Sequence, residues 1–345
     1  MNMKIYWFLV AFFLLFTFFS IPQSPVFASQ PVEKCVKSHW FTNCFPLPPK
    51  IRPTPKPPKP PSPTPSPTPP VIGAALENYK QPHGRNCDID VPSQFSTIQA
   101  AIDVAAPGDT ICVGAGTYNE DIFINKSIHL SGKGALKTII NGQGPTWPGA
   151  VYVTATNVIV EGFFIRGVGT NVAAQLSGND LTFASTLRYN WMQAGNGGMA
   201  LQLDGFQNST LVQNNILEGN NSPHVARESG GSSGRVDFLN NTFIGSVNPN
   251  TRSDTGITLD AGLPDSLIKQ NAFKTTGTMI ALIIPNGTSI INENNFSSST
   301  TIKVSNGWPT TVNAENNWWG DTDPSDNIQG DVDFTPFAIS PFAEY

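Results

Sequence analysis

Histidine, cysteine and charged residues are scarce in this chain. Its 345 residues include 4 histidines and 4 cysteines, and only 13% of them are charged. No two cysteines form a Cys-x-x-Cys pair and no histidine stands at a zinc-ligand spacing from them, so the pattern of a structural zinc site is missing. The even number of cysteines instead predicts two disulfides between sequence neighbours in an exported chain, Cys35 with Cys44 and Cys87 with Cys112.

A surplus of basic residues is confined to residues 1–70, which carry seven Lys or Arg and one acid. Residues 71–345 carry 13 basic and 24 acidic side chains, a net charge of −11. A field of that sign repels other polyanions. We therefore expect no nucleic-acid partner and no strongly acidic polymer as a ligand.

One long apolar run, residues 5–21, follows Lys4. Val26 and Ala28 then stand at the small-residue positions of a cleavage site. This pattern predicts a signal peptide over residues 1–28 and a secreted or envelope-associated protein. The alternative is an uncleaved anchor, which would give the chain a membrane contact through this segment.

The next two segments read as a small loop and a linker. Residues 29–45 surround Cys35 and Cys44, and residues 46–70 hold proline at 14 of 25 positions. Each proline removes a backbone donor and fixes φ, so we expect a disordered, polyproline II-like linker of roughly 75 Å when fully extended. A solvated stalk is the preferred interpretation; contact with an anionic cell wall and a proline-rich recognition ligand are the alternatives.

The main domain is predicted over residues 71–345 and starts with one short helix. Ser96 and Gln99 have the spacing of a capping box, and apolar residues recur at helical spacing from Ile98 to Ala105. Pro107 and Gly108 end the helix. Strand-like pieces follow at 110–113 and 122–124.

Downstream, a short phrase around an asparagine repeats at spacings of 24, 27, 30, 23 and 22 residues. The anchors are Asn190, Asn214, Asn241, Asn271, Asn294 and Asn316. Two places after each anchor stands an apolar residue predicted to fill the interior: Met192, Ile216, Phe243, Phe273, Phe296 and Trp318. We expect each anchor both to adopt left-handed turn geometry and to bond the coils above and below in a ladder.

Strands and turns repeating at this period predict an all-β solenoid of seven to nine stacked coils, about 40 Å long. The end of such a stack exposes apolar interior and unpaired strand edges. We expect the helix at 96–106 to cover the first coil.

The stretch "FSTIQAAIDVAAPGDTICVGAGTYNEDIFINKSIHLSGKG", from Phe95 to Gly134, resembles the N-terminal cap of the right-handed parallel β-helix superfamily, also called pectin lyase-like. The stretch from Asn316 to Phe337 resembles its closing coil. The resemblance covers about residues 86–340 and implies a single-stranded right-handed parallel β-helix. It does not imply one activity, because this superfamily holds lyases, hydrolases, esterases, adhesins and other repeat proteins.

Enzyme motifs of that superfamily are missing. The phrase "GRVDFLNN" is similar to an element of pectin methylesterases and would make Asp237 a catalytic carboxylate, but the partner phrases do not occur and the repeat explains it equally well. The motifs of pectate lyases and polygalacturonases are absent. His129 and two further histidines, His83 and His224, stand near no paired carboxylates, and we expect them on the surface or in loops.

Two aspartates remain as candidates for new chemistry. Asp204 and Asp260 occupy the same turn column two coils apart, about 10 Å, which is near the upper separation of an acid and base pair in inverting glycosidases. The preferred interpretation is structural, because Asp before Gly favours a turn. Arg235 and Arg252 lie nearby in the sequence and would suit a sugar carboxylate.

Tryptophans and acids close the chain. One of the adjacent Trp318 and Trp319 must point outward if both lie on a strand, and we take Trp319 as the candidate for stacking on a sugar. Asp321, Asp323 and Asp326, with two further aspartates, Asp331 and Asp333, offer oxygen ligands for a Ca²⁺ ion, the one cofactor considered, but plain loop acids are preferred.

The sequence therefore predicts an exported β-helix that binds or presents to a polysaccharide or a cell-wall surface. The alternatives are a polysaccharide lyase, hydrolase or esterase acting in the lateral groove, and a purely structural spacer. The motifs leave open whether the chain is an enzyme, and its oligomeric state is not predicted.

Overall fold

A computed structural model describes residues 34–37, 42–45, 76–77, 79–80, 87–144, 148–178, 182–205, 208–222, 224–229, 234–245, 255–259, 265–275, 282–284, 288–297, 302–307 and 309–343. The predicted signal peptide, its cleavage site and the proline-rich linker lie outside these residues. Within them, no helix has the length and apolar character needed to cross a membrane.

A small hairpin belongs to a separate compact unit, residues 1–64. Its strands β1 (Lys34–Lys37) and β2 (Thr42–Phe45) pair antiparallel, and their register sets Cys35 opposite Cys44. The side chains of these strands lie outside the described part of the chain, so the predicted Cys35–Cys44 disulfide stays a prediction.

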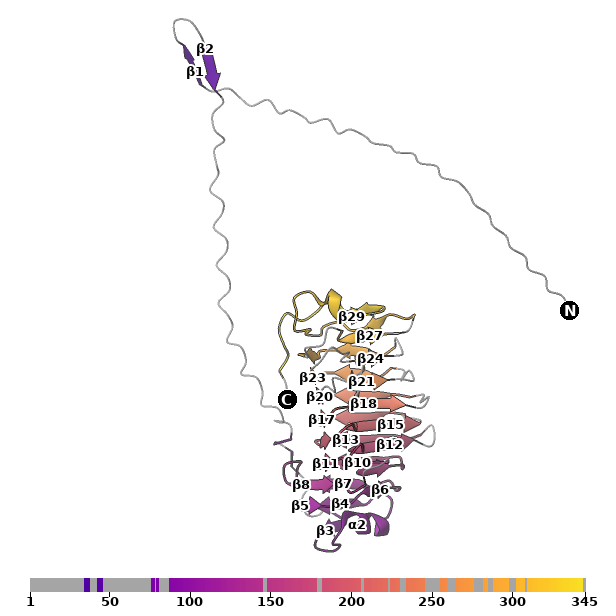
Figure 1. The fold of residues 1–345 in the computed structure, drawn as a ribbon. Coiled ribbons are helices and arrows are strands. Elements are labelled where there is room, and N and C mark those ends of the chain that lie inside the picture. Colours follow the sequence, from indigo (N-terminus) through magenta and orange to yellow (C-terminus); the bar gives the residue numbers. More distant parts are fainter. Residues whose placement is uncertain are drawn as a thin grey trace, which may run out of the picture. The chain divides into compact units, whose positions relative to one another are not determined.

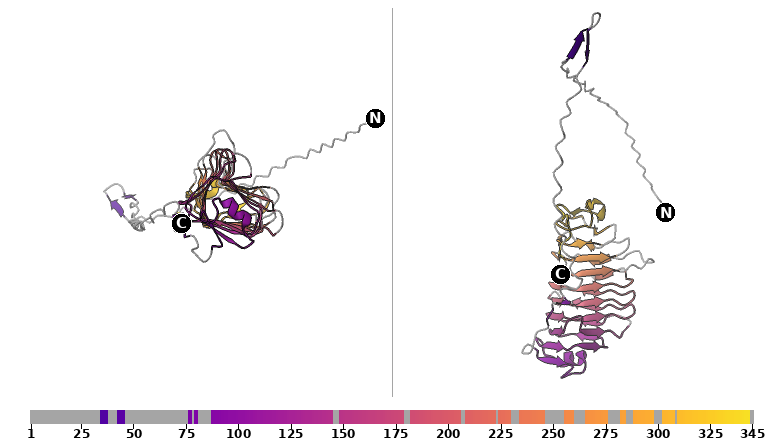
Figure 2. Two further views of the ribbon diagram at one scale, coloured as in Figure 1. Left: turned by 90° about the horizontal axis from the view of Figure 1, so that it is seen from below. Right: turned by 90° about the vertical axis from the view of Figure 1, so that its left-hand side faces the viewer.

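The second unit, residues 65–345, is a solenoid of about eight turns built from three parallel sheets. Figure 1 shows the strands of successive turns stacked directly over one another, and Figure 2 shows the three sheets enclosing the interior when the stack is viewed along its axis. This confirms the predicted all-β parallel β-helix. A turn cannot bury its own apolar side, so neighbouring turns share one continuous core.

Along the chain, successive strands are added to the three sheets in turn. The eleven-strand sheet holds β3 (Ile89–Val91), β4 (Thr110–Val113), β7 (His129–Gly132), β10 (Val158–Glu161), β13 (Ser185–Arg188), β16 (Thr210–Gln213), β19 (Val236–Leu239), β22 (Leu267–Lys269), β25 (Ile290–Asn292), β28 (Val312–Asn313) and β30 (Val332–Asp333). The eight-strand sheet holds β5 (Gly116–Tyr118), β8 (Thr138–Asn141), β11 (Phe164–Arg166), β14 (Trp191–Gln193), β17 (Ile216–Glu218), β20 (Thr242–Gly245), β23 (Ala272–Thr275) and β26 (Asn295–Phe296). The nine-strand sheet holds β6 (Ile122–Ile124), β9 (Val151–Val153), β12 (Ala174–Gly178), β15 (Leu201–Gly205), β18 (His224–Ser229), β21 (Thr255–Leu259), β24 (Leu282–Ile284), β27 (Val304–Asn306) and β29 (Ile328–Gln329).

The short helix α2 (Ile98–Val104) lies across the end of the stack beside β3 and β4 (Figures 1 and 2). The predicted Ser96–Gln99 capping box is wrong, because Thr97 is the N-cap and its hydroxyl accepts a hydrogen bond from the N–H of Ala100. The neighbouring turn satisfies two further N–H groups at the start of the helix, because the carboxylate of Glu120 accepts hydrogen bonds from the N–H groups of Ile98 and Gln99.

The apolar face of α2 closes the core from that end. Its buried residues are Ile98, Ala101 and Ile102. At the other end of the helix, the ammonium of Lys126 donates to the carbonyl oxygens of Ile102, Asp103 and Ala105, where the helix dipole favours a cation.

An asparagine ladder runs along the inside of the turns between the eleven-strand and eight-strand sheets. Its members are Asn190, Asn215, Asn241, Asn271, Asn294 and Asn317, each buried. Each Oδ1 from Asn215 onward accepts the backbone N–H and the Nδ2–H of the asparagine one turn earlier, while each Nδ2 donates to a carbonyl of the earlier turn.

The ladder corrects the predicted anchors at two turns. Asn214 and Asn316 have positive φ, near 56° and 58°, and the ladder residue is the next one along. The left-handed residue and the ladder residue are thus adjacent columns rather than one. At these two turns the residues that fill the interior are therefore Leu217 and Trp319, and not the predicted Ile216 and Trp318.

Candidate functional site

The outer face of the nine-strand sheet carries a continuous row of polar and aromatic side chains. The parallel register aligns Phe123, Tyr152, Gln175, Gln202 and Arg227 on five successive turns. The residues flanking each of them are buried in the core, so the side chains of the row alternate to the outer side of the solenoid. We call these five residues the outer row.

The first two residues of the outer row form an aromatic pair beside a cavity. The rings of Phe123 and Tyr152 stack with centroids 5.5 Å apart, and Phe123 is 42% exposed. The adjacent cavity has a volume of about 480 Å³. It is lined by Asp121, Ile122, Phe123, Gly144, Pro148, Gly149 and Tyr152. This combination of apolar walls and an acid at the rim suits a small polar ligand with apolar faces.

A carboxylate held by two amides follows along the same face. Asp204 lies on β15, two residues after Gln202, and is half-buried. The Nε2 atoms of Gln175 and Gln202 both donate to its carboxylate, the latter at 3.0 Å to each oxygen. Gln175 is fully buried and its Oε1 has no hydrogen-bond partner in the described structure. An unpaired buried carbonyl costs free energy, and because Gln175 is fully buried it supports Asp204 from beneath rather than meeting a ligand itself.

Two residues of the predicted set, one acid and one arginine, have no described position. Asp260 and Arg252 lie outside the described residues. Leu203 and Leu259, which precede Asp204 and Asp260, occupy one register column two strands apart. The pairing of the two acids therefore stays a prediction.

Asp237 and Arg235 lie on another face. Asp237 is on β19 of the eleven-strand sheet, and Arg235 Nε donates to both of its carboxylate oxygens at 2.8 and 2.9 Å. The same carboxylate accepts the N–H of Leu267 at 2.9 Å. The hydrogen bond to Asp237 raises the pKa of Arg235. These contacts describe a local ion pair, and the structure does not bring it to the outer row.

The assignment of Trp319 as an outward tryptophan is wrong. Trp319 is fully buried and its ring stacks on Phe296 with centroids 4.9 Å apart. Trp318, the residue before it, is half-buried instead. The left-handed Asn316 displaces the alternation by one position, so Trp319 cannot stack on a sugar.

The acids near the C-terminus are satisfied by their own segment. Asp321 accepts the N–H groups of Asp323 and Thr322, which lower the pKa of the Asp321 carboxyl, and Asp323 caps the 3₁₀ helix η2 (Pro324–Asn327). Nearby, burial lowers the pKa of Lys303, against the opposing effect of Asp321 and Asp326. The ammonium of Lys303 donates to the carbonyl oxygen of Trp319, and a Ca²⁺ ion at these acids stays the alternative to plain loop acids.

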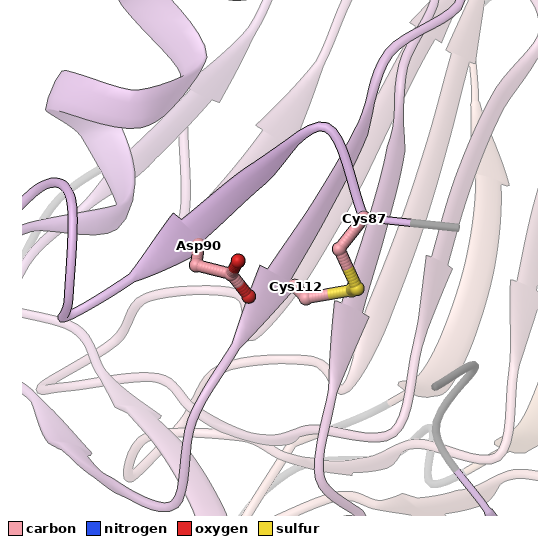
Figure 3. Close-up of side chains that lie close together, drawn as sticks. All are labelled: Cys87, Asp90 and Cys112. Atoms are coloured by element: carbon pink, nitrogen blue, oxygen red, sulfur yellow. A yellow bond between two sulfur atoms is a disulfide. The ribbon is translucent and has the colours of Figure 1, made fainter. Parts of the chain in front are cut away.

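Among the described residues, one set of three metal-type side chains converges, formed by Cys87, Asp90 and Cys112 (Figure 3). Its two cysteines are joined in a disulfide, with Cα atoms 5.6 Å apart, as predicted. Their sulfur atoms are therefore not thiolate ligands. The bond ties β4 to Cys87, two residues before β3, at the start of the solenoid.

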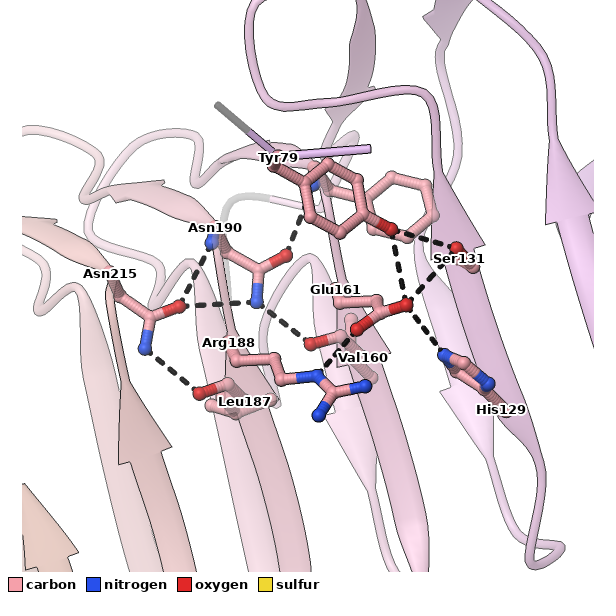
Figure 4. A network of polar contacts seen from close by, with 10 residues as sticks. Tyr79, His129, Ser131, Val160, Glu161, Leu187, Arg188, Asn190 and Asn215 are labelled. Carbon is pink, nitrogen blue, oxygen red and sulfur yellow. Dashed lines mark hydrogen bonds and ion pairs between the residues drawn. The ribbon is translucent and has the colours of Figure 1, made fainter. Parts of the chain in front are cut away.

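A buried carboxylate on the eleven-strand sheet was missed in the sequence. Glu161 is 2% exposed and contacts His129, Ser131, Arg188 and Tyr79 (Figure 4). His129, which was expected near no paired carboxylates, lies on β7 with its Nε2 2.8 Å from the single carboxylate of Glu161.

The acid–base geometry of this cluster does not fit nucleophilic catalysis. Ser131 and His129 both contact the carboxylate of Glu161, whereas a triad needs the histidine between the serine and the acid. The only sequence signal was a lone glutamate at the end of the otherwise apolar strand "VIVE". Its partners come from three other segments and become visible only through the register.

Comparisons with known proteins give one short sequence match. No family model matches the chain. Over 82 residues the chain is 37% identical to a cell surface glycoprotein of Methanothermus fervidus, a match that covers 23% of this chain and 13% of that protein. The chain thus spans a small part of the length of this relative.

Similar solved structures include three carbohydrate-related enzymes. Rice weevil pectin methyl esterase is 14% identical with a TM-score of 0.44, covering 75% of this chain and 84% of its own. A pectin methylesterase in complex with hexasaccharide VII is 12% identical with a TM-score of 0.41, covering 67% and 80%. An alginate lyase from Paenibacillus sp. str. FPU-7 is 13% identical with a TM-score of 0.38, covering 68% and 95%. Likeness at this level carries no chemistry. The three parallel sheets by themselves make the chain a parallel β-helix.

Proposed function

We propose that this chain is an extracellular β-helix protein that binds a polysaccharide along the outer row. The observation that carries the proposal is the alignment of an aromatic pair, two amides, a carboxylate and a guanidinium along one face of the nine-strand sheet. Successive turns are about 4.8 Å apart. That repeat is comparable to the length of one sugar residue, so neighbouring turns would meet neighbouring sugars.

The side chains of the outer row suit sugar chemistry. An amide both donates to and accepts from hydroxyls, a carboxylate accepts from them, and Asp204 is already held in place by Gln175 and Gln202. Phe123 and Tyr152 offer apolar surface beside the cavity at one end. A held carboxylate loses little side-chain entropy on binding, which favours affinity.

Charge narrows the ligand class. With a net charge of −11 over residues 71–345, the domain repels a densely anionic polymer. We therefore propose a neutral or sparsely charged polysaccharide, with Arg227 placed in the outer row to meet an occasional sugar carboxylate.

Two observations support an extracellular location. The Cys87–Cys112 disulfide is typical of an oxidising compartment. The matched relative is a cell surface glycoprotein. The signal peptide over residues 1–28 and the linker over residues 46–70 are predictions that would place the β-helix outside the cell on a stalk.

A polysaccharide-cleaving enzyme is the second candidate, and Asp204 is the observation that favours it. This carboxylate is held in position on the exposed face. Hydrolysis by the usual mechanism needs a second carboxyl group. Among the described outward positions of β12, β15 and β18, Asp204 is the one acid. Binding is therefore the better supported function.

Replacing Asp204 with Asn is expected to weaken polysaccharide binding by about tenfold, because an ionised acceptor becomes a neutral amide. Binding of the full chain would be measured on a panel of immobilised polysaccharides. Asp237→Asn is the matched control, since Asp237 is also a half-buried carboxylate held by neighbours but lies on another sheet. Equal losses in both variants, or no retained polysaccharide, would contradict the proposal. Soluble fragments that disappear in Asp204→Asn would favour the enzyme instead.

A further inference from the structure

A short segment ahead of the first turn is fastened to the side of the solenoid. Its described residues are Leu76, Glu77, Tyr79 and Lys80, which we call the strap. Leu76 is 5% exposed and belongs to an apolar cluster with Ala135 and Ile216. The strap lies outside the repeating turns of the solenoid.

Tyr79 makes the polar half of the fastening. Its hydroxyl donates to Glu161 Oε1 at 3.1 Å and lies 2.9 Å from Ser131 Oγ, and its ring packs on Tyr189 with centroids 5.2 Å apart (Figure 4). Burial is the main cause that raises the pKa of Tyr79 well above its usual value, so the phenol stays a donor. The side of the solenoid thus offers both an apolar contact surface for Leu76 and a buried hydrogen-bond acceptor for the hydroxyl of Tyr79.

The site is also shaped for the tyrosine ring. Gly162 has φ of +77°, and a Cβ built there would lie 2.4 Å from Cε1 of Tyr79. The equivalent positions on later turns are filled by larger residues, beginning with Tyr189. A left-handed glycine at this one turn therefore leaves the room that the ring of Tyr79 occupies.

The carboxylate at the centre of the fastening is ionised. Three groups besides Tyr79 face Glu161: His129 and Ser131 from β7, and Arg188 from β13. Burial alone would raise the pKa of Glu161, but the hydrogen bonds from His129 and Arg188 outweigh it and hold the pKa below its usual value. Protonation would remove the ion pair with Arg188 and weaken the acceptor for Tyr79.

We propose that the side of the solenoid where the eleven-strand sheet adjoins the eight-strand sheet carries a receptor site for the strap of its own chain, and that protonation of Glu161 releases the strap. While the strap is bound, which we call the closed state, a force applied to the residues before it is carried by its contacts with several turns. In the released state, the same pull reaches the first turn, where the Cys87–Cys112 disulfide is the next restraint. The fastening therefore protects the first turn of the stack from being peeled away.

The direction of the pH effect follows from the lowered pKa of Glu161. A carboxylate whose pKa is lower in the folded state contributes stability that is present above its unfolded value, about 4.3, and is lost as the pH falls through the folded value. Release is thus expected only in acid, below the pH at which an unperturbed glutamate is protonated.

Hydroxyl-radical footprinting of the full chain tests this device. Oxidation of Leu76 would be read by mass spectrometry at pH 7 and pH 3.5, with the buried Met192 as the internal reference. We expect Leu76 oxidation to rise at least about fivefold in acid while Met192 stays protected. In Tyr79→Phe, Leu76 oxidation should already be raised at pH 7, because two hydrogen bonds of the strap are lost.

Two controls separate strap release from general loosening. Glu161→Gln has no charge to lose, so Leu76 oxidation in that variant should not change with pH. Tyr152→Phe removes a hydroxyl elsewhere on the surface and should leave Leu76 protected at pH 7. Equal Leu76 protection in the wild type and Tyr79→Phe, or a pH response that persists in Glu161→Gln, would overturn the proposal.

Discussion

Asn241→Ala is expected to lower the free energy of unfolding of the solenoid by about 3 to 5 kcal/mol. Asn241 is 1% exposed, accepts from the N–H and Nδ2 of Asn215, and donates to the Val212 carbonyl and to Asn271. The truncation leaves several of these groups buried without partners, and each such group costs about 1 to 3 kcal/mol. Urea unfolding monitored by far-UV circular dichroism would measure the loss.

The residue before it gives a sharp control. Asn240 has φ of 56° and its side chain bonds Asn214 at the half-buried rim of the turn. Asn240→Gly keeps the left-handed geometry available, so we expect a loss of less than about 1 kcal/mol. Similar losses at both positions would show that the two columns do not have the separate roles assigned to them.

Phe273→Ala is expected to cost about 3 to 5 kcal/mol, the range for removing a large aromatic side chain from a packed core. Its ring stacks on Phe243 and Phe296 with centroids 5.0 and 4.9 Å apart, in an interior column that continues to Trp319. A cavity in the middle of this column removes contacts on two sides, and the parallel turns on either side cannot close it without breaking register.

Phe123→Ala is the matched comparison for this prediction. Phe123 also stacks on an aromatic ring of the next turn, but it is 42% exposed on the outer face. We expect its loss to stay below about 1.5 kcal/mol in the same unfolding experiment. Equal costs for the two phenylalanines would contradict an interior role for the Phe273 column.

The sequence repeat predicted the fold correctly, but it did not predict which residue occupies each position within a turn. Period and turn residues identify a solenoid, because every turn must present the same column of side chains to its neighbours. The anchors at Asn214 and Asn316 were placed one residue early, since both the left-handed position and the ladder position hold asparagine there. The same step reversed the roles of Trp318 and Trp319.

The candidate site was only partly visible in the sequence. Asp204 stood out because it belongs to a recurrent turn column. Gln175, Gln202 and Arg227 did not, because single outward residues of different turns become a row only when the strand register is known. The contacts of Glu161 were hidden for the same reason, and Tyr79 lies outside the repeat altogether.

The central claim, that the outer row binds sugar, is tested most directly by comparing two outward aromatic residues on different sheets. Tyr152 stacks on Phe123 in the outer row, and Trp191 stacks on Phe164 on the eight-strand sheet, with centroids 4.6 Å apart. Affinity electrophoresis of Tyr152→Ala and Trp191→Ala would be run in gels containing the polysaccharide that the wild type retains. We expect Tyr152→Ala to lose retention and Trp191→Ala to keep it. Retention that is kept by Tyr152→Ala, or lost only in Trp191→Ala, would contradict it.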